Sequence, residues 1–240
     1  MMMERITPYL LTAIFLCCTT VVRAQIYDGQ HKYDGEHKNE ITSYVMGGYN
    51  IVTEGFGGLE VSYKRHLTDR WHVGGDAQAQ FGKQLYSIGV QGGYRLPVGL
   101  SNFYINAMAL LNRYERWNVN ETIGNMSVTW EMPYFHFRFG GAYLHYKMED
   151  FGYTEPPIMI LGTSVHIRPR WNPWNIGLFL RNYDDYFYDG WNINWGLNFY
   201  APLHRDMQLF GELNIRPAGS LNQLATRYES SGKLGIKFVW

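Results

Sequence analysis

The sequence predicts an all-β protein, an antiparallel up-and-down β-barrel, on three observations. Apolar and polar residues alternate through most of residues 43–240, which places every second side chain on one face of a strand. Short turn signals and longer polar or aromatic stretches separate these runs, and no convincing amphipathic helix interrupts them. Aromatic residues make up 17% of the 240 residues, so the chain has enough large side chains for an ordered fold.

The first 24 residues have the pattern of a secretory signal peptide. Arg5 precedes an apolar stretch over residues 9–22, and Ala24 offers a small residue at the expected cleavage site. This apolar stretch is shorter than the roughly 20 residues that a membrane-spanning helix needs. The sequence therefore predicts an exported protein whose leader, residues 1–24, is removed.

The remaining chain divides into two predicted parts. Residues 25–41 are polar and are expected to form a flexible periplasmic N-terminal tail, and residues 42–240 are expected to form the barrel. Both cysteines, Cys17 and Cys18, lie in the leader, so neither disulfides nor thiol chemistry is expected after cleavage. Basic and acidic residues balance at 21 each, which gives no support for a nucleic-acid partner.

The alternation and the turn signals together place the strands. We expect them near residues 43–53, 57–66, 71–82, 85–96, 102–117, 125–132, 134–147, 158–169, 174–183, 191–201, 207–216 and 231–240. This gives 12 strands. If the break at Glu131-Met132-Pro133 and its partner are absent, the number falls to 10, because bacterial single-chain barrels keep an even number of strands. Short turns are expected at 67–70, 97–100, 170–173 and 203–206, and longer connections at 118–125, 148–157, 183–190 and 217–230.

The polar rows of the strands indicate which face meets which solvent. In one such strand, for example, Val61 belongs to the apolar row, and Glu60 and Lys64 belong to the polar row. Across the chain the polar rows hold mainly Gly, Ser, Asn and Gln with scattered charges, whereas a soluble sandwich would show surfaces rich in Lys and Glu. The pattern therefore predicts a transmembrane barrel with apolar rows toward lipid and polar rows toward the lumen. A soluble, exported, carbohydrate-binding β-sandwich is the alternative from a different class.

By the same alternation, a set of charged side chains is predicted to face the lumen. These residues are Glu60, Lys64, Asp76, Arg95, Glu131, Arg138, Arg168, Arg181, Glu212 and Arg216. Charges inside a narrow barrel must pair or stay hydrated, because isolated burial costs several kcal/mol. Two interpretations stay open: a salt-bridged, plugged lumen, or a narrow pore whose excess of basic groups favours anions.

Tryptophans lie at the expected strand ends, where an aromatic girdle of a membrane barrel would lie. The predicted girdle consists of Trp71, Trp117, Trp171, Trp174 and Trp191. The final segment places Leu234, Ile236, Phe238 and Trp240 on one face and ends on an aromatic residue. It resembles the C-terminal signal that bacterial outer-membrane β-barrel proteins present to their assembly machinery, with Trp in place of the commoner Phe. The chain as a whole resembles the small barrels of Bacteroidota-type bacteria.

This resemblance implies an outer-membrane location, with outer-membrane lipid, lipopolysaccharide and the barrel-assembly machinery as partners; it does not fix an oligomeric state. Some barrels of this kind are hydrolases, whose serine type carries a His-x-Ser pair that is absent here. Ser164 and His166 share a face in the reverse order, and Asp184, Asp185 and Asp189 fall in one connection. A hydrogen bond and solvated acids are the favoured interpretations, so no catalytic residue is predicted.

No phosphate-binding glycine loop, His-Glu-x-x-His segment or EF-hand spacing occurs, and neither a cofactor nor a metal is expected. The favoured function is therefore an outer-membrane barrel with a structural or interaction role and a largely plugged lumen. A narrow anion-preferring channel is the first alternative. An outer-membrane hydrolase and the soluble sandwich are the distant ones.

Overall fold

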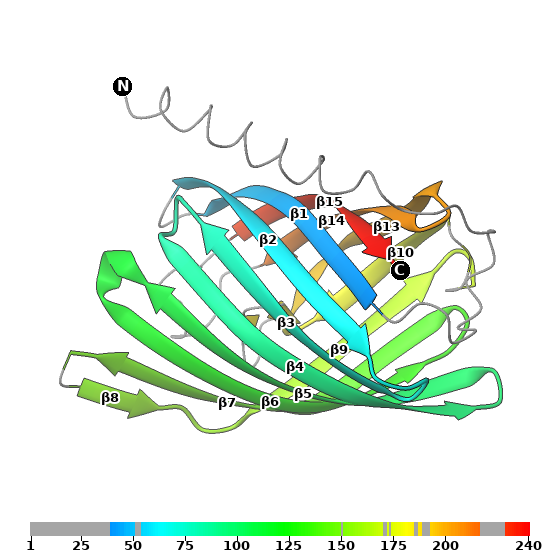
Figure 1. Cartoon of the computed structure of the whole chain (residues 1–240). Coiled ribbons are helices and arrows are strands. Elements are labelled where there is room, and N and C mark those ends of the chain that lie inside the picture. The colour runs from blue at the N-terminus through cyan, green and yellow to red at the C-terminus, as the bar shows by residue number, and fades with distance from the viewer. Residues whose placement is uncertain are drawn as a thin grey trace.

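Twelve antiparallel strands surround a single barrel axis (Figure 1). The computed structural model describes residues 39–50, 54–149, 151–169, 172, 174–184, 187–188, 193–216 and 229–240. The barrel strands are β1 (Asn39–Asn50), β2 (Glu54–His66), β3 (Trp71–Gln80), β4 (Leu85–Val98), β5 (Ser101–Tyr114), β6 (Val119–Glu131), β7 (Phe135–Met148), β9 (Ile158–His166), β10 (Asn175–Arg181), β13 (Asn194–His204), β14 (Met207–Arg216) and β15 (Glu229–Val239).

Three further strands and one short helix belong to the connections. Strand β8 (Phe151–Thr154) pairs with the end of β7 and prolongs that hairpin beyond the barrel wall, as Figure 1 shows. Strands β11 (Tyr183–Asp184) and β12 (Phe187–Tyr188) form a small hairpin, and a 3-10 helix, η2 (Glu115–Trp117), links β5 to β6. In the described part of the chain, no helix is long and apolar enough to cross a membrane.

The sheet closes on itself through its first and last strands. Strand β1 pairs with β15 from Glu40–Val239 to Asn50–Glu229, and β6 pairs with β7 along its whole length. Closure leaves no edge strand in the ring, so every barrel strand has two neighbours. The prediction of a 12-stranded antiparallel barrel is confirmed, including the break after Glu131, and the alternatives of 10 strands and of an open two-layer sandwich are wrong.

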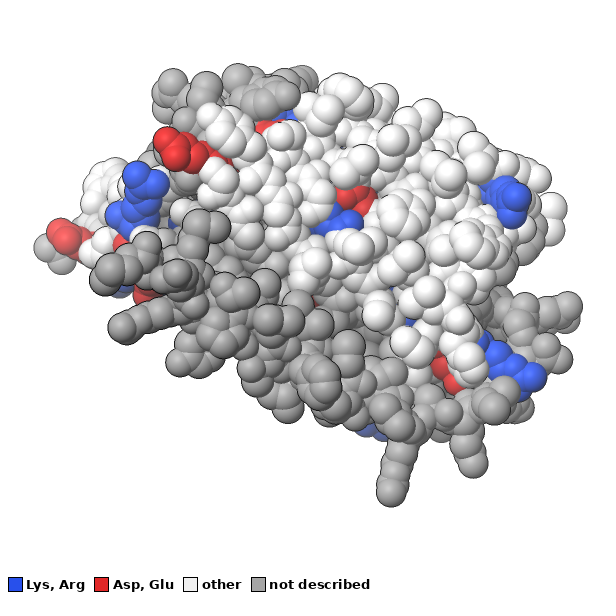
Figure 2. All heavy atoms as spheres, turned by 90° about the horizontal axis from the view of Figure 1, so that it is seen from above, with Lys and Arg blue, Asp and Glu red and all other residues white. Residues whose placement is uncertain are grey.

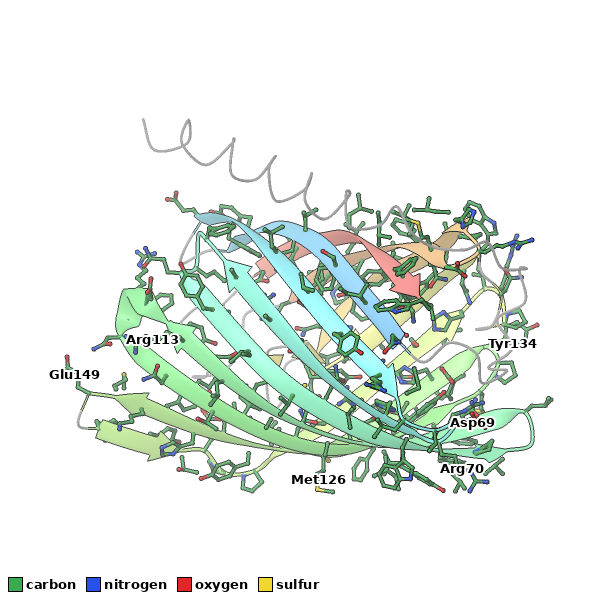
Figure 3. All side chains as sticks on the ribbon, in the orientation of Figure 1. Asp69, Arg70, Arg113, Met126, Tyr134 and Glu149 are labelled. Atoms are coloured by element: carbon green, nitrogen blue, oxygen red, sulfur yellow. The ribbon has the colours of Figure 1, made fainter. Side chains whose placement is uncertain are left out.

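The connections lie at the two ends of the barrel, and the two longest, which follow β10 and β14, lie at the same end. We call turn end the end that carries the β2–β3, β4–β5, β6–β7, β9–β10 and β13–β14 connections and the C-terminus, and loop end the opposite end. Figure 3 shows Asp69, Arg70 and Tyr134 at the turn end and Arg113 and Glu149 at the loop end. The expected long connection at 118–125 is wrong, because β6 begins at Val119.

Two turn-end connections show how local chemistry fixes the pairing register. In the β2–β3 turn, the Thr68 hydroxyl accepts hydrogen bonds from the backbone N–H groups of Arg70 and Trp71, at 3.2 and 3.0 Å. In the β4–β5 turn, Gly99 adopts a φ of +60°, a left-handed conformation that side chains disfavour. Each turn thereby determines which residues of its two strands face each other.

Apolar rows face outward and polar rows face inward along the strands. Val90 on β4 is 63% exposed and Met126 on β6 is 65% exposed, whereas their strand neighbours Gly89 and Ser127 are buried. Figure 3 shows Met126 pointing away from the barrel, and Figure 2 shows a face that is mostly uncharged, with most charges toward its two ends. An apolar band between charged rims is the surface expected of a barrel in contact with lipid.

Several expectations concern residues that lie outside the described part of the chain. These are the signal peptide at 1–24, most of the tail at 25–41, the girdle members Trp171 and Trp191, and the acids Asp185 and Asp189. The barrel begins at Asn39, three residues before the expected boundary.

Candidate functional site in the barrel lumen

A cavity of about 640 Å³ occupies the lumen toward the turn end. Its lining comes from strands all around the ring, because each strand contributes alternate side chains to the interior. Seven of the predicted lumen residues line it: Glu60, Lys64, Asp76, Glu131, Arg138, Arg181 and Glu212. These side chains are thus brought together from β2, β3, β6, β7, β10 and β14.

The other three predicted lumen residues do not line the cavity. Arg95 lies near the turn end and donates from Nε to Asn102 Oδ1 at 2.9 Å. Arg216 is buried at the loop end, where its Nε lies 3.3 Å from Asn194 Oδ1. The lumen position expected for Arg168 is wrong: β9 ends at His166, so the alternation no longer applies and Arg168 is exposed in the β9–β10 connection.

Five acidic or histidine residues of the cavity wall were absent from the predicted set. Glu40 was assigned to the N-terminal tail, although it pairs with Val239 and Lys64 in the sheet register. The other four are histidines that line the cavity: His66, His72, His136 and His166. The same alternation would have identified the histidines, since each lies two or four residues from a predicted lumen residue or pairs directly with another cavity residue.

The charges of the lining nearly cancel. The cavity is lined by five carboxylates, four Lys or Arg residues and the four histidines. Glu40 lies between two lysines, with Oε2 2.7 Å from Lys237 Nζ and Oε1 3.7 Å from Lys64 Nζ. Arg181 Nη2 lies 2.6 Å from Glu212 Oε1. The excess of basic groups expected from the sequence is therefore not found in the cavity.

Two arginines and a tyrosine form one row of the cavity wall. Arg138 on β7 and Arg181 on β10 both pair in register with Gly162 on β9, which lies between them. The Tyr183 ring occupies the space over Gly162, where a Cβ would come within 2.7 Å of the ring. The guanidinium carbons lie 4.7 Å (Arg138) and 5.9 Å (Arg181) from the ring centroid, within the range of cation–π contacts.

The Ser164–His166 pair of the sequence analysis also lies in the cavity wall. Ser164 Oγ is 3.0 Å from His166 Nε2 and 3.4 Å from Nδ1 of His136. A serine nucleophile additionally needs an oriented base and donors for the developing oxyanion. The contacts of Ser164 support a polar network in the wall, and no group of three or more His, Cys, Asp or Glu residues suited to a metal occurs in the described residues.

Apolar side chains pack together on one side of the lumen toward the loop end, and we call them the loop-end cluster. Its members come from β4, β5, β6, β7, β9 and β11: Leu85, Leu110, Tyr114, Val119, Ile123, Ala142, Leu144, Tyr146, Ile158, Ile160 and Tyr183. Leu110, Ile123 and Ile160 have no exposed surface at all. Tyr183 belongs both to this cluster and to the cavity lining, so it forms the boundary between them.

A buried ion pair lies inside the same end of the barrel. Lys83, from the β3–β4 connection, places Nζ 2.5 Å from Glu229 Oε2 on β15, and both residues are almost fully buried. The Lys83 ammonium also lies 4.0 Å from the centroid of the Phe56 ring on β2. These contacts join three nearby parts of the ring, namely β15, β2 and the β3–β4 connection.

The aromatic residues of the predicted girdle fall into different positions. Trp71 and Trp174 are exposed at the turn end, whereas Trp117 packs against the loop-end cluster. Trp117, the last residue of η2, is only partly exposed, and its ring lies 6.2 Å from that of Tyr114. Exposed tryptophans that the prediction omitted are Trp130 at the turn end and Trp195 at the loop end.

The C-terminal segment forms the closing strand. Leu234, Ile236 and Trp240 are exposed on the outer face and Phe238 is partly buried. The Trp240 ring lies 5.2 Å from that of Phe238 and 6.4 Å from that of Tyr63. The backbone of Trp240 exchanges two hydrogen bonds with Asn39, so the last residue completes the seam.

Solved structures with the same architecture are outer-membrane barrels. A KdgM porin in complex with disordered oligogalacturonate aligns with a TM-score of 0.57 and 7% identity, over 84% of this chain and 99% of that one. The NanC porin aligns with a TM-score of 0.52 and 13% identity, over 82% of this chain and 98% of that one. This chain has the fold of an outer-membrane β-barrel.

This outer-membrane-type barrel also resembles an enzyme of the same architecture. An active-site mutant of the outer membrane phospholipase A from Escherichia coli aligns with a TM-score of 0.50 and 9% identity, over 89% of this chain and 94% of that one. No protein-family model and no curated protein sequence matches the chain. At these identities the likeness establishes the fold.

Deleting Trp240 is expected to reduce insertion while leaving export intact, because the seam loses its two terminal hydrogen bonds and the closing aromatic residue. Trp240→Phe keeps both features and is expected to insert at nearly the normal level. Immunoblots of periplasmic and outer-membrane fractions measure both steps. An unchanged outer-membrane yield after the deletion would contradict a role of the C-terminal segment in barrel assembly.

Proposed function

We propose that the protein is an outer-membrane barrel with a structural or interaction role, whose lumen is closed to ions at the loop end. It would reach the membrane through a cleaved signal peptide and the barrel-assembly machinery, and it would contact outer-membrane lipid and lipopolysaccharide. The exposed apolar band supports this location. In such barrels the short turns face the periplasm, so the cavity would open on the periplasmic side.

The loop-end cluster is the observation that carries the closed lumen. Leu110, Ile123, Leu144 and Ile160 are fully buried inside the barrel although they come from four different strands. Packed apolar side chains exclude water, and an ion without its hydration shell meets a cost of many kcal/mol. The Lys83–Glu229 pair supports the same proposal, since its charges are neutralised within the lumen.

A non-catalytic role is part of this proposal. The Ser164 hydroxyl has two imidazole neighbours, which also fits a hydrogen-bonded wall of a polar cavity. The narrow anion-preferring channel stays as the second candidate because two of the similar solved structures are porins. The near balance of charge in the cavity favours the closed barrel over it.

Conductance separates the two candidates. The full chain, refolded and reconstituted into a planar lipid bilayer, is expected to produce no stable channel steps under an applied voltage. A porin of known conductance in the same bilayer serves as the positive control. Stable steps from the unmodified protein would contradict the closed lumen, and a reversal potential favouring anions would establish the channel instead.

A further inference from the structure

We propose that the turn-end cavity binds a small molecule through a carboxylate or phosphate group, and that Arg138 is the residue that recognises this anion. The proposal goes beyond a structural role for the barrel. It does not require the loop end to be closed, because the site lies wholly within the cavity.

Arg138 has more hydrogen-bond donors than the protein uses. A guanidinium group carries five N–H donors. The Nε–H of Arg138 donates to Ser127 Oγ at 2.8 Å, and the Tyr183 ring covers one face at 4.7 Å. Within the described part of the chain, no carboxylate lies within ion-pair distance of Arg138 and no acceptor engages its four Nη–H donors.

The neighbouring acids are engaged elsewhere. Glu131, on the adjacent strand β6, accepts a hydrogen bond from the Tyr104 hydroxyl at 3.0 Å, on its β5 side. Glu212 pairs with Arg181, so the second guanidinium of this wall is matched by a carboxylate. Arg138 therefore keeps its positive charge available to the cavity.

The opposite wall carries charges of both signs. Strand β1 lies six strands from β7 around the ring in either direction, so the two stand across the lumen from each other. There Lys64 and Lys237 share the single carboxylate of Glu40. Glu60 and Asp76, on β2 and β3, also line this wall, so the positive charge that a bound anion meets directly is that of Arg138.

Polar side chains next to Arg138 suit the rest of such a ligand. His136 precedes Arg138 by two residues on the same face, Ser164 pairs with His136, and Thr129 pairs with Arg138. All three line the cavity, whose volume of about 640 Å³ lies in the range of small-molecule sites. A partly enclosed guanidinium binds carboxylate or phosphate through two parallel charge-assisted hydrogen bonds, and more strongly than in bulk water.

Ligand-observed NMR on the folded full chain in detergent tests the site, with acetate as the probe and acetamide as its uncharged counterpart. In low-chloride buffer we expect saturation transfer to acetate and not to acetamide. Arg138→Gln is expected to weaken acetate binding at least tenfold, and Arg138→Lys to weaken it less, because the charge stays and the planar fork is lost. Arg113→Gln is the matched control, since this arginine bonds to Asn118 and Asn120 at the loop end.

Each variant must retain the heat-dependent gel mobility of the folded barrel. Equal acetate binding by the unmodified protein and by folded Arg138→Gln would overturn the proposal, and so would the absence of acetate binding to the unmodified protein. Inorganic phosphate then distinguishes the ligand sources. If phosphate displaces acetate at a phosphate concentration below that of acetate, the ligand is assigned as phosphorylated. If phosphate does not displace acetate, the ligand is assigned as carboxylated.

Discussion

Replacing Lys83 by methionine is expected to destabilise the barrel by about 3–5 kcal/mol, the cost of breaking a buried ion pair from one side. Lys83 is 3% exposed and Glu229 is 4% exposed, so the substitution leaves the Glu229 carboxylate inside the lumen without its ammonium partner. The contact of Lys83 with the Phe56 ring is lost as well. Urea titration of the barrel refolded in lipid vesicles measures the free energy of unfolding.

Two further variants show whether the loss comes from breaking this ion pair. Lys83→Met combined with Glu229→Leu removes both charges and is expected to recover most of the stability. Lys64→Met breaks a partly exposed pair and is expected to cost about 1 kcal/mol or less. If the double variant is as unstable as Lys83→Met, the ion pair does not explain the loss of stability. That result would contradict the claim that burial of this pair at the loop end makes its loss costly.

Replacing Val90 by arginine is expected to cost about 2–4 kcal/mol and to lower the amount of folded barrel sharply. Val90 lies in the middle of β4 on the outward row and is 63% exposed. In a membrane this position would meet hydrocarbon, where an arginine has no water and no partner. Heat-dependent gel mobility of the outer-membrane fraction measures the folded amount.

Leu100→Arg is the matched control for the outward face. Leu100 is more exposed still, at 81%, but it lies in the β4–β5 turn beyond the end of the strand. An arginine there reaches water, so the yield of folded barrel is expected to stay close to normal. Equal yields from Val90→Arg and Leu100→Arg would contradict a lipid-facing band at β4.

The strands could be predicted from the sequence because alternation is a local signal. Each outward residue such as Val90 differs in polarity from its neighbours, and turn signals such as Leu67-Thr68-Asp69-Arg70 end the strands where the structure ends them. The start of β6 could not be found in this way. Val119 and Ile123 face inward into the loop-end cluster, so the rule that apolar residues face lipid fails there and the stretch resembles a loop.

The candidate site was predictable in its residue types and not in its pairings. Alternation places Arg138 and Arg181 on the inward face, but only the register of β7, β9 and β10 brings both beside Gly162 and under Tyr183. Glu40 was missed because its strand begins in a polar stretch that resembles a tail. Which charges neutralise each other depends on contacts between strands far apart in sequence, and no local pattern reports them.

Gel mobility of the membrane-extracted protein, before and after boiling, tests the central claim most directly. A closed barrel has every strand paired on both sides, so detergent alone is expected to leave it folded and boiling to change its mobility. The account predicts such a shift, with the protein in the outer-membrane fraction. Protein recovered in the soluble periplasmic fraction, with the same mobility before and after boiling, would contradict it.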